Sequence, residues 1–194
     1  VTCDENNTPT AFSLTLHATD LEGNTITWSV STPAAHGTAT AGGTGTSKVI
    51  SYTPAVNYNG SDSFVIRVSD GHGGTDNITV NVTINPVNDP PVITEGLSVA
   101  VTCSEDNAPT AFSLTLHATD ADGDVITWSV STPAAHGTAT ASGTGTSKVI
   151  TYGPEANYNG SDSFIISVAD GNGGTDNITV NVTVNPVNAP PVIT

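Results

Sequence analysis

Basic side chains are almost absent from this chain of 194 residues. Lys48, Arg67 and Lys148 stand against 18 acidic residues, which gives a formal net charge of −15. A surface this acidic repels nucleic acid and anionic lipid, so neither is an expected partner. Two explanations of the charge stay open: adaptation for solubility or high salt, and carboxylates gathered to hold cations. The positions of the acidic residues favour the second.

Long apolar runs are also missing. No continuous apolar stretch exceeds a few residues, so the sequence predicts no membrane span in this fragment. The chain does not open with the basic start and apolar middle of a signal peptide, so for an exported protein we expect that signal further upstream.

Catalytic signatures are missing as well. There is no nucleophile elbow, no phosphate loop and no metal-ligand spacing of Cys and His. Aromatic residues make up only 5% of the chain, and Trp28 and Trp128 fall at inward strand positions, where we expect them in the core. We therefore expect that the chain is not an enzyme. A carbohydrate-binding β-sandwich module of a secreted multidomain protein is the alternative function, and it would need exposed aromatic side chains.

Two copies of one sequence make up the chain. Val1-Thr2-Cys3 recurs as Val101-Thr102-Cys103, and the register then holds without a gap, with 18 of the 94 aligned positions differing. The period is the size of one small domain, so we expect two repeats, 1–94 and 101–194, with a linker at about 87–100. Such close identity suggests a recent duplication, and we expect a longer array of these repeats.

Each copy has the pattern of a series of short strands. In the first copy the apolar and β-branched runs lie at 12–17, 26–30, 49–52, 64–68, 78–84 and 97–99. A period of two between Gly- and Pro-rich turns is typical of half-buried antiparallel strands. About seven strands a repeat predict an all-β fold of two tandem Ig-like or cadherin-like Greek-key β-sandwiches.

The turns resemble those of cadherin repeats. Residues 118–124, Ala-Thr-Asp-Ala-Asp-Gly-Asp, resemble the Asp-x-Asp calcium loop, and 168–171 resemble the second acidic turn. Residues 87–92, Val-Asn-Asp-Pro-Pro-Val, resemble the linker, and 104–107 resemble the acidic motif near the start of a repeat. The segment 57–64, Asn-Tyr-Asn-Gly-Ser-Asp-Ser-Phe, is similar to one in the bacterial cadherin-like repeats of large surface adhesins. The resemblance covers essentially the whole chain and implies an extracellular structural or adhesive repeat of a longer surface adhesin or filament.

Calcium (Ca²⁺) is the cofactor that this resemblance implies, because cadherins hold it between successive repeats. The ligands carried over for the junction between the first and second repeats are Glu5, Asn88, Asp89, Asp120, Asp122 and Asp170. Asp124 adds a carboxylate to the loop, and the first-copy counterparts are Asp20, Glu22 and Asp70.

The chemistry of the loop supports calcium independently. Calcium takes six to eight hard oxygen ligands from flexible loops, and Asp120, Asp122 and Asp124 alternate around Gly123. The alternative is that Asp and Gly simply favour a tight turn. Cadherins usually carry a further acidic motif where this chain has Asn57-Tyr58-Asn59-Gly60, so fewer ions or weaker binding are expected.

The two copies differ at these positions. The second copy has Asp122 and Asp124 where the first has Glu22 and Asn24, and the linker residue Asp89 becomes Ala189. If the pair of repeats is iterated, we expect tight calcium binding where the first repeat precedes the second and weak binding at the opposite junction.

Cys3 and Cys103 occupy equivalent positions in successive domains, too far apart in an extended array for an intrachain disulfide. Two alternatives stay open: an intermolecular disulfide to a parallel copy of the chain, and a free thiol buried at a strand edge.

Asn-x-Ser/Thr sequons are dense. They begin at Asn6, Asn59, Asn77, Asn81, Asn159, Asn177 and Asn181. The spacing of Asn77 and Asn81 predicts that both lie on one solvent-exposed face of the last strand, where glycosylation is a hypothesis.

Overall fold

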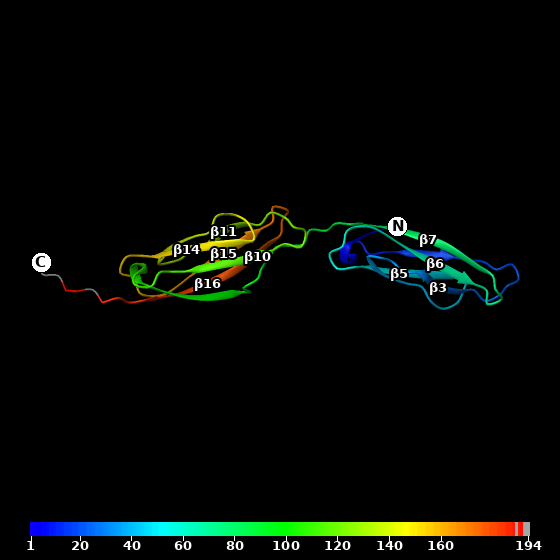
Figure 1. The fold of residues 1–194 in the computed structure, drawn as a ribbon, viewed down its shortest axis with the longest axis horizontal. Coiled ribbons are helices and arrows are strands. Elements are labelled where there is room, and N and C mark those ends of the chain that lie inside the picture. The colour runs from blue at the N-terminus through cyan, green and yellow to red at the C-terminus, as the bar shows by residue number, and fades with distance from the viewer. Residues whose placement is uncertain (189, 192–194) are drawn as a thin grey trace. The chain divides into compact units, whose positions relative to one another are not determined.

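The computed structural model describes residues 1–188 and 190–191 and divides the chain into unit 1, Val1–Val87, and unit 2, Asn88–Thr194. Each unit is an Ig-like sandwich of two β-sheets, which confirms the all-β fold (Figure 1). No helix among the described residues is long and apolar enough to cross a bilayer.

Unit 1 has seven strands in its described residues. They are β1 (Thr2–Asp4), β2 (Leu14–His17), β3 (Thr27–Thr32), β4 (Gly37–Thr40), β5 (Ser47–Pro54), β6 (Gly60–Ser69) and β7 (Thr75–Asn85). One sheet has the order β1-β7-β6-β3 and the other β2-β5-β4. All pairs are antiparallel except β1 with β7, and a one-turn 3₁₀ helix, η1 (Glu5–Asn7), follows β1.

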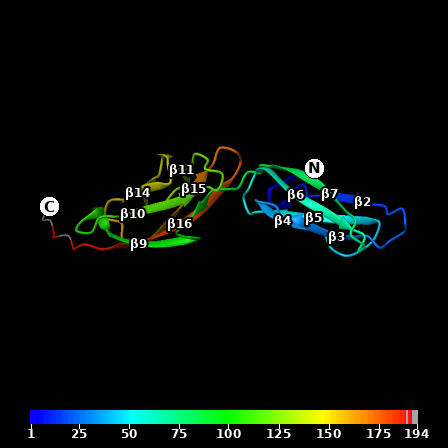
Figure 2. The ribbon, with the colours of Figure 1, turned by 45° about the vertical axis from the view of Figure 1, so that its right-hand side comes forward.

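Unit 2 repeats these strands and adds two short ones. Its elements are β8 (Val92–Ile93), β9 (Ser98–Ser104), η2 (Glu105–Asn107), β10 (Leu114–Thr119), β11 (Thr127–Thr132), β12 (Gly137–Thr140), β13 (Gly143–Thr144), β14 (Ser147–Pro154), β15 (Gly160–Ala169) and β16 (Thr175–Asn185). The sheets have the orders β13-β11-β15-β16-β9 and β12-β14-β10-β8. Figure 2 shows β9 lying along β16, which it pairs with in parallel.

The core of each unit forms where inward residues of the two sheets meet. Ile50, Phe64 and Val80 in unit 1 are buried because alternate residues of a strand point to the same face. Trp28 and Trp128 are buried as predicted, and each indole N–H donates to a glycine carbonyl, of Gly45 at 2.7 Å and Gly145 at 2.6 Å. These hydrogen bonds satisfy the one polar group that each ring buries.

The segment 57–64 has a structural role through its aspartate. In unit 1, Asp62 accepts hydrogen bonds from the backbone N–H of Ala35, His36 and Ser63 and from the Tyr52 hydroxyl, at 2.7–3.0 Å. Asp162 makes the same four contacts in unit 2. The aspartate thus fixes the β3–β4 turn to the start of β6, which the sequence had not indicated.

The second unit begins earlier than the period suggested. Residues 92–93 and 98–100 lie in β8 and β9 of unit 2, although we expected them in a linker at 87–100 between repeats 1–94 and 101–194. The difference arises because Ile93 is an integral part of the unit 2 core, 2% exposed. Ala189 and the last three residues of the expected second repeat, 192–194, lie outside the described residues.

Candidate functional site

The loop between β10 and β11 of unit 2 gathers three carboxylates. Carboxylate oxygens of Asp120, Asp122 and Asp124 lie within 4.8 Å of one another. Asp120 Oδ1 accepts the backbone N–H groups of Asp122 at 3.0 Å and Asp124 at 3.1 Å, which folds the loop back on itself. Gly123 permits the turn with φ of +78°. The structure therefore brings together the three aspartates that the spacing predicted.

The start of unit 2 is tied to this loop and to the next acidic turn. The backbone N–H of Asp89 donates to Asp122 Oδ2 at 2.7 Å. The side-chain amide of Asn88 donates to Asp170 Oδ2 at 2.8 Å. Both linker residues of the predicted ligand set thus contact aspartates of that set within unit 2.

Asp170 occupies the turn between β15 and β16. Its Oδ1 accepts the backbone N–H groups of Asn172 at 2.7 Å and Gly174 at 3.0 Å. The hydrogen bond from Asn88, followed by these backbone bonds, holds the pKa of Asp170 below its usual range. Asp170 is therefore a carboxylate anion at neutral pH.

Asn172 connects the two acidic turns, since its side-chain amide donates to Asp124 Oδ2 at 2.6 Å. Asn172 was not among the residues predicted for the site. The only signal for it was that the first copy has His72 at the equivalent position.

The donor set fits a calcium ion. Asp89 Oδ2 and Asp120 Oδ2 are buried oxygens with no hydrogen-bond partner among the described residues. A buried carboxylate oxygen without a donor is costly, and a bound cation would satisfy it. All the candidate ligands are oxygen atoms, which a hard divalent cation prefers.

The equivalent residues of unit 1 are arranged more loosely. Asp20 Oδ1 accepts the backbone N–H of Asn24 at 2.9 Å, and Glu22 is exposed. Asp70 accepts from the backbone N–H groups of His72 and Gly74, bonds that lower its pKa. In the described part of unit 1, Asp20, Glu22 and Asp70 form no group of three converging carboxylates.

Glu5 has a role inside its own unit. It is buried, and its Oε1 accepts the backbone N–H of Val87 at the end of unit 1. Glu105 makes the same contact with Val187 in unit 2 at 2.7 Å. This acidic residue therefore fixes the exit of the chain from each unit, while Glu5 Oε2 has no hydrogen-bond partner in the part of the chain that is described.

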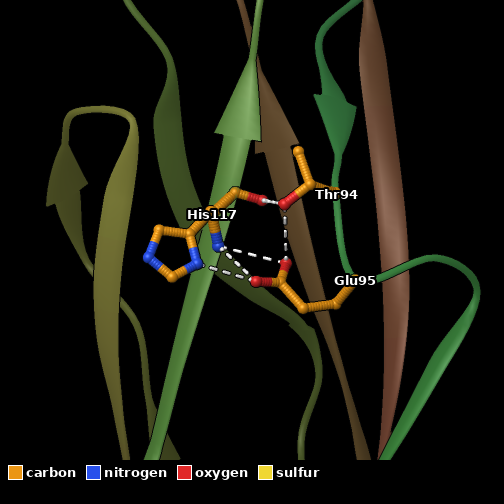
Figure 3. Close-up of polar contacts among 3 residues, drawn as sticks. All are labelled: Thr94, Glu95 and His117. Atoms are coloured by element: carbon orange, nitrogen blue, oxygen red, sulfur yellow. Dashed lines mark hydrogen bonds and ion pairs between the residues drawn. The ribbon is translucent and has the colours of Figure 1, made fainter.

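A further carboxylate interaction in unit 2 was not predicted. Glu95 accepts hydrogen bonds from both the ring Nδ1, at 2.8 Å, and the backbone N–H, at 3.1 Å, of His117 (Figure 3). Burial raises the pKa of Glu95, but the bonds from His117 outweigh it and hold the pKa below its ordinary value.

The cysteines and sequons have contrasting environments. The Cys3 and Cys103 thiols are 0% exposed and free, and burial raises the pKa of both. This arrangement favours the buried-thiol alternative, since a bond to a neighbouring chain would require β1 or β9 to leave its sheet. All seven sequon asparagines are exposed, including Asn77 and Asn81 on β7 as predicted.

Comparison with known proteins identifies the repeat. A family model described as bacterial Ig domain matches residues 1–83 and again 88–183. No curated protein matches the sequence. Among solved structures, protocadherin gamma B2 extracellular cadherin domains 1–5 match with a TM-score of 0.56 at 15% identity, over 96% of this chain and 39% of that one.

Two further solved structures are similar. Human mucin-like protocadherin EC1-2 has a TM-score of 0.51 at 15% identity, over 96% of this chain and 95% of that one. An endo-fucoidan hydrolase from glycoside hydrolase family 107 has a TM-score of 0.40 at 19% identity, and this chain spans only 27% of it. At these identities the protocadherin matches show a shared cadherin-like fold, and the hydrolase match is too distant to bear on function.

Proposed function

This chain belongs to the bacterial Ig domain family as a tandem pair, and on that premise we propose that it is a non-catalytic structural or adhesive repeat. It forms part of an extracellular adhesin or filament, and calcium stiffens the junction between its repeats. The cadherin-like fold and the acidic turns support this role. Its partners are the neighbouring repeats of the same chain and parallel copies of itself.

The cluster around Asp120 is the observation that carries the proposal. At about 4.8 Å and an effective dielectric constant of about 20, each pair of carboxylates repels by roughly 3 kcal/mol. Backbone and amide donors offset part of this repulsion, but Asp89 Oδ2 and Asp120 Oδ2 receive none from the described residues. A divalent cation would turn the repulsion into attraction.

Stiffening follows from where these ligands lie in the chain. Asn88 and Asp89 directly follow the last residue of unit 1, Val87, and are hydrogen-bonded to the loops of unit 2. An ion held by Asp89, Asp120 and Asp122 would fix the conformation of this connecting segment. The resemblance to cadherins assigns a further ligand, Glu5, to the preceding repeat, so the ion would limit bending at the junction.

The two kinds of junction are expected to differ. The segment that directly follows unit 1 carries Asp89, whereas the corresponding residue of the second copy is Ala189. Unit 1 would also present the looser set, with Glu22 and Asn24 in place of Asp122 and Asp124. We expect calcium to stabilise a two-domain fragment in which the first repeat precedes the second. We expect calcium to have little effect on a fragment in which the second repeat precedes the first.

Calorimetric titration of the 194-residue chain with calcium tests the proposal. Asp120→Asn with Asp122→Asn is expected to abolish the binding heat, while the matched unit 1 pair, Asp20→Asn with Glu22→Gln, leaves it in place. At calcium about 100-fold above Kd, the folded state gains about 2.7 kcal/mol, seen as a higher Tm of one transition. Identical Tm and identical small-angle scattering with calcium and with chelator would refute the role of calcium.

A further inference from the structure

One sheet of each unit lacks acidic residues altogether. The described strands β2, β5 and β4 of unit 1 and β8, β10, β12 and β14 of unit 2 contain no Asp or Glu, although the chain has 18. The opposite sheet of each unit does contain carboxylates, among them Asp62 and Asp162. The negative charge of the chain therefore lies away from this one sheet, in turns, in connecting segments and in the opposite sheet.

The outward surface of this sheet, which we call the threonine face, consists of small uncharged side chains. In unit 1 its exposed residues are Thr15, Thr38, Thr40, Val49, Ser51 and Thr53. Val49 lies inside β5 and is 72% exposed, and its counterpart Val149 on β14 is 68% exposed. Both valines point away from the core, because alternate residues of a strand lie on opposite faces of its sheet. The face thus presents an apolar side chain to solvent at the same place in both units.

Several hydroxyl groups of the threonine face are already hydrogen-bonded to each other. The hydroxyls of Thr140 and Thr151 lie 2.5 Å apart, across the pair β12 and β14. Those of Thr40 and Ser51 form the same cross-strand bond in unit 1. A polar group costs free energy on burial when it loses its partner in water. Because these hydroxyls have partners within the face, covering the face costs less than its composition suggests.

We propose that the threonine face is the surface through which a second copy of this chain associates laterally, face to face. Two chains of net charge −15 repel each other, and the repulsion is smallest where both present a surface without carboxylates. Small side chains allow two sheets to stack about 10 Å apart, as in a sandwich. The contact uses the same patch on both copies, which closes it as a symmetric pair. This inference rests on the proposed function, which names copies of the chain as partners, and it supplies the surface.

The size of the face sets the strength of the contact. Three strands, the longest of eight residues, cover roughly 27 by 14 Å, or about 400 Å². A stable complex buries about 800 Å² on each partner. We therefore expect weak, reversible association with a Kd of about 0.1–1 mM for one pair of faces.

Sedimentation equilibrium of the 194-residue chain, from about 10 μM to about 1 mM, tests the association. It is measured in chelator, so a failure of the calcium proposal leaves the result unchanged. The weight-average mass is expected to rise with concentration. Sodium chloride is expected to raise the association constant by about threefold or more between 0.1 and 1 M, because the screening length falls from about 10 Å to about 3 Å. A contact built on ion pairs would weaken instead.

Two matched pairs of substitutions locate the contact. Val49→Asp with Val149→Asp adds one charge to each threonine face and should weaken association by about tenfold or more. Asn81→Asp with Asn181→Asp adds the same charge to exposed positions of the opposite sheet and should have little effect. All four positions are exposed, so both variants should keep the Tm of the wild-type chain.

Three results would overturn the proposal. The first is a wild-type chain that stays monomeric at about 1 mM in high salt, which would mean that any occupant of the face is not a second copy. The second is association that salt weakens. The third is an equal loss of association in the two variants, since net charge rather than the threonine face would then control it.

Discussion

Replacing Asp162 by alanine removes the acceptor that joins the β11–β12 turn to the start of β15. Asp162 is 8% exposed and accepts four hydrogen bonds. Asp162→Ala leaves the hydroxyl of the buried Tyr152 and the N–H groups of Ala135 and His136 without this acceptor. Unpaired buried donors cost about 1–3 kcal/mol each. Because some of them can reach water, we expect a loss of about 3 kcal/mol in the free energy of unfolding of unit 2.

The assay uses unit 1 as an internal reference. For a domain of this size about 3 kcal/mol lowers Tm by roughly 12–24 °C. Calorimetry of Asp162→Ala should therefore show a lower Tm for the unit 2 transition and an unchanged Tm for the unit 1 transition. Asp62→Ala should instead lower the Tm of the unit 1 transition alone. A displacement of less than about 4 °C, or of both transitions together, would refute the reasoning.

The pH dependence gives a second readout of the same group. Burial raises the pKa of Asp162, but the bonds from Tyr152, His136, Ala135 and Ser163 outweigh it and lower the pKa. Its contribution to stability is present above the unfolded pKa of about 3.9 and is lost as pH falls through the lower folded value. The Asp162→Ala chain should lack this part of the acid destabilisation.

Two further predictions concern other groups. Glu95 has a lowered pKa, so its bond to His117 should stabilise unit 2 above about pH 4.3 and lose effect below it. Because the His117 side chain is 56% exposed, the contribution should be well under about 1 kcal/mol, and Glu95→Gln should flatten the pH dependence by that amount in urea titrations. Both cysteines are buried, so a thiol reagent should label neither in the native chain and both in denaturant, and fast native labelling would contradict their placement.

The strands could be predicted from sequence wherever alternation is strong. The runs around Leu14, Trp28 and Phe64 all lie in or beside strands. β4 was missed because Gly37–Thr40 has no large apolar residue, and β8 because a strand of two residues after Pro-Pro has no period to read. Such strands form because neighbouring strands supply the pairing, and that information lies elsewhere in the chain.

Some residues of the candidate site could also be predicted from sequence, and others could not. Asp120, Asp122 and Asp124 could be predicted as a group because they are close in sequence and one turn joins them. The bond from Asn172 to Asp124 could not, because it spans 48 positions. The role of Asp162 was hidden for a similar reason, since two of its backbone partners, Ala135 and His136, lie 27 and 26 positions earlier in the chain.

A repeated sequence gives the length of a domain but not the position where it begins. Identity between 1–94 and 101–194 is equally compatible with domains that start at 88, 95 or 101. The packing of Ile93 selects the first, since a unit that starts at Asn88 and ends at Val187 contains β8 and matches the end of unit 1 at Val87. A fragment of residues 88–187 should therefore be more stable than 1–87, by about 1.5–3 kcal/mol for the burial of one isoleucine. Urea denaturation of the two fragments measures this difference, and equal stability would mean that β8 does not belong to the domain it precedes.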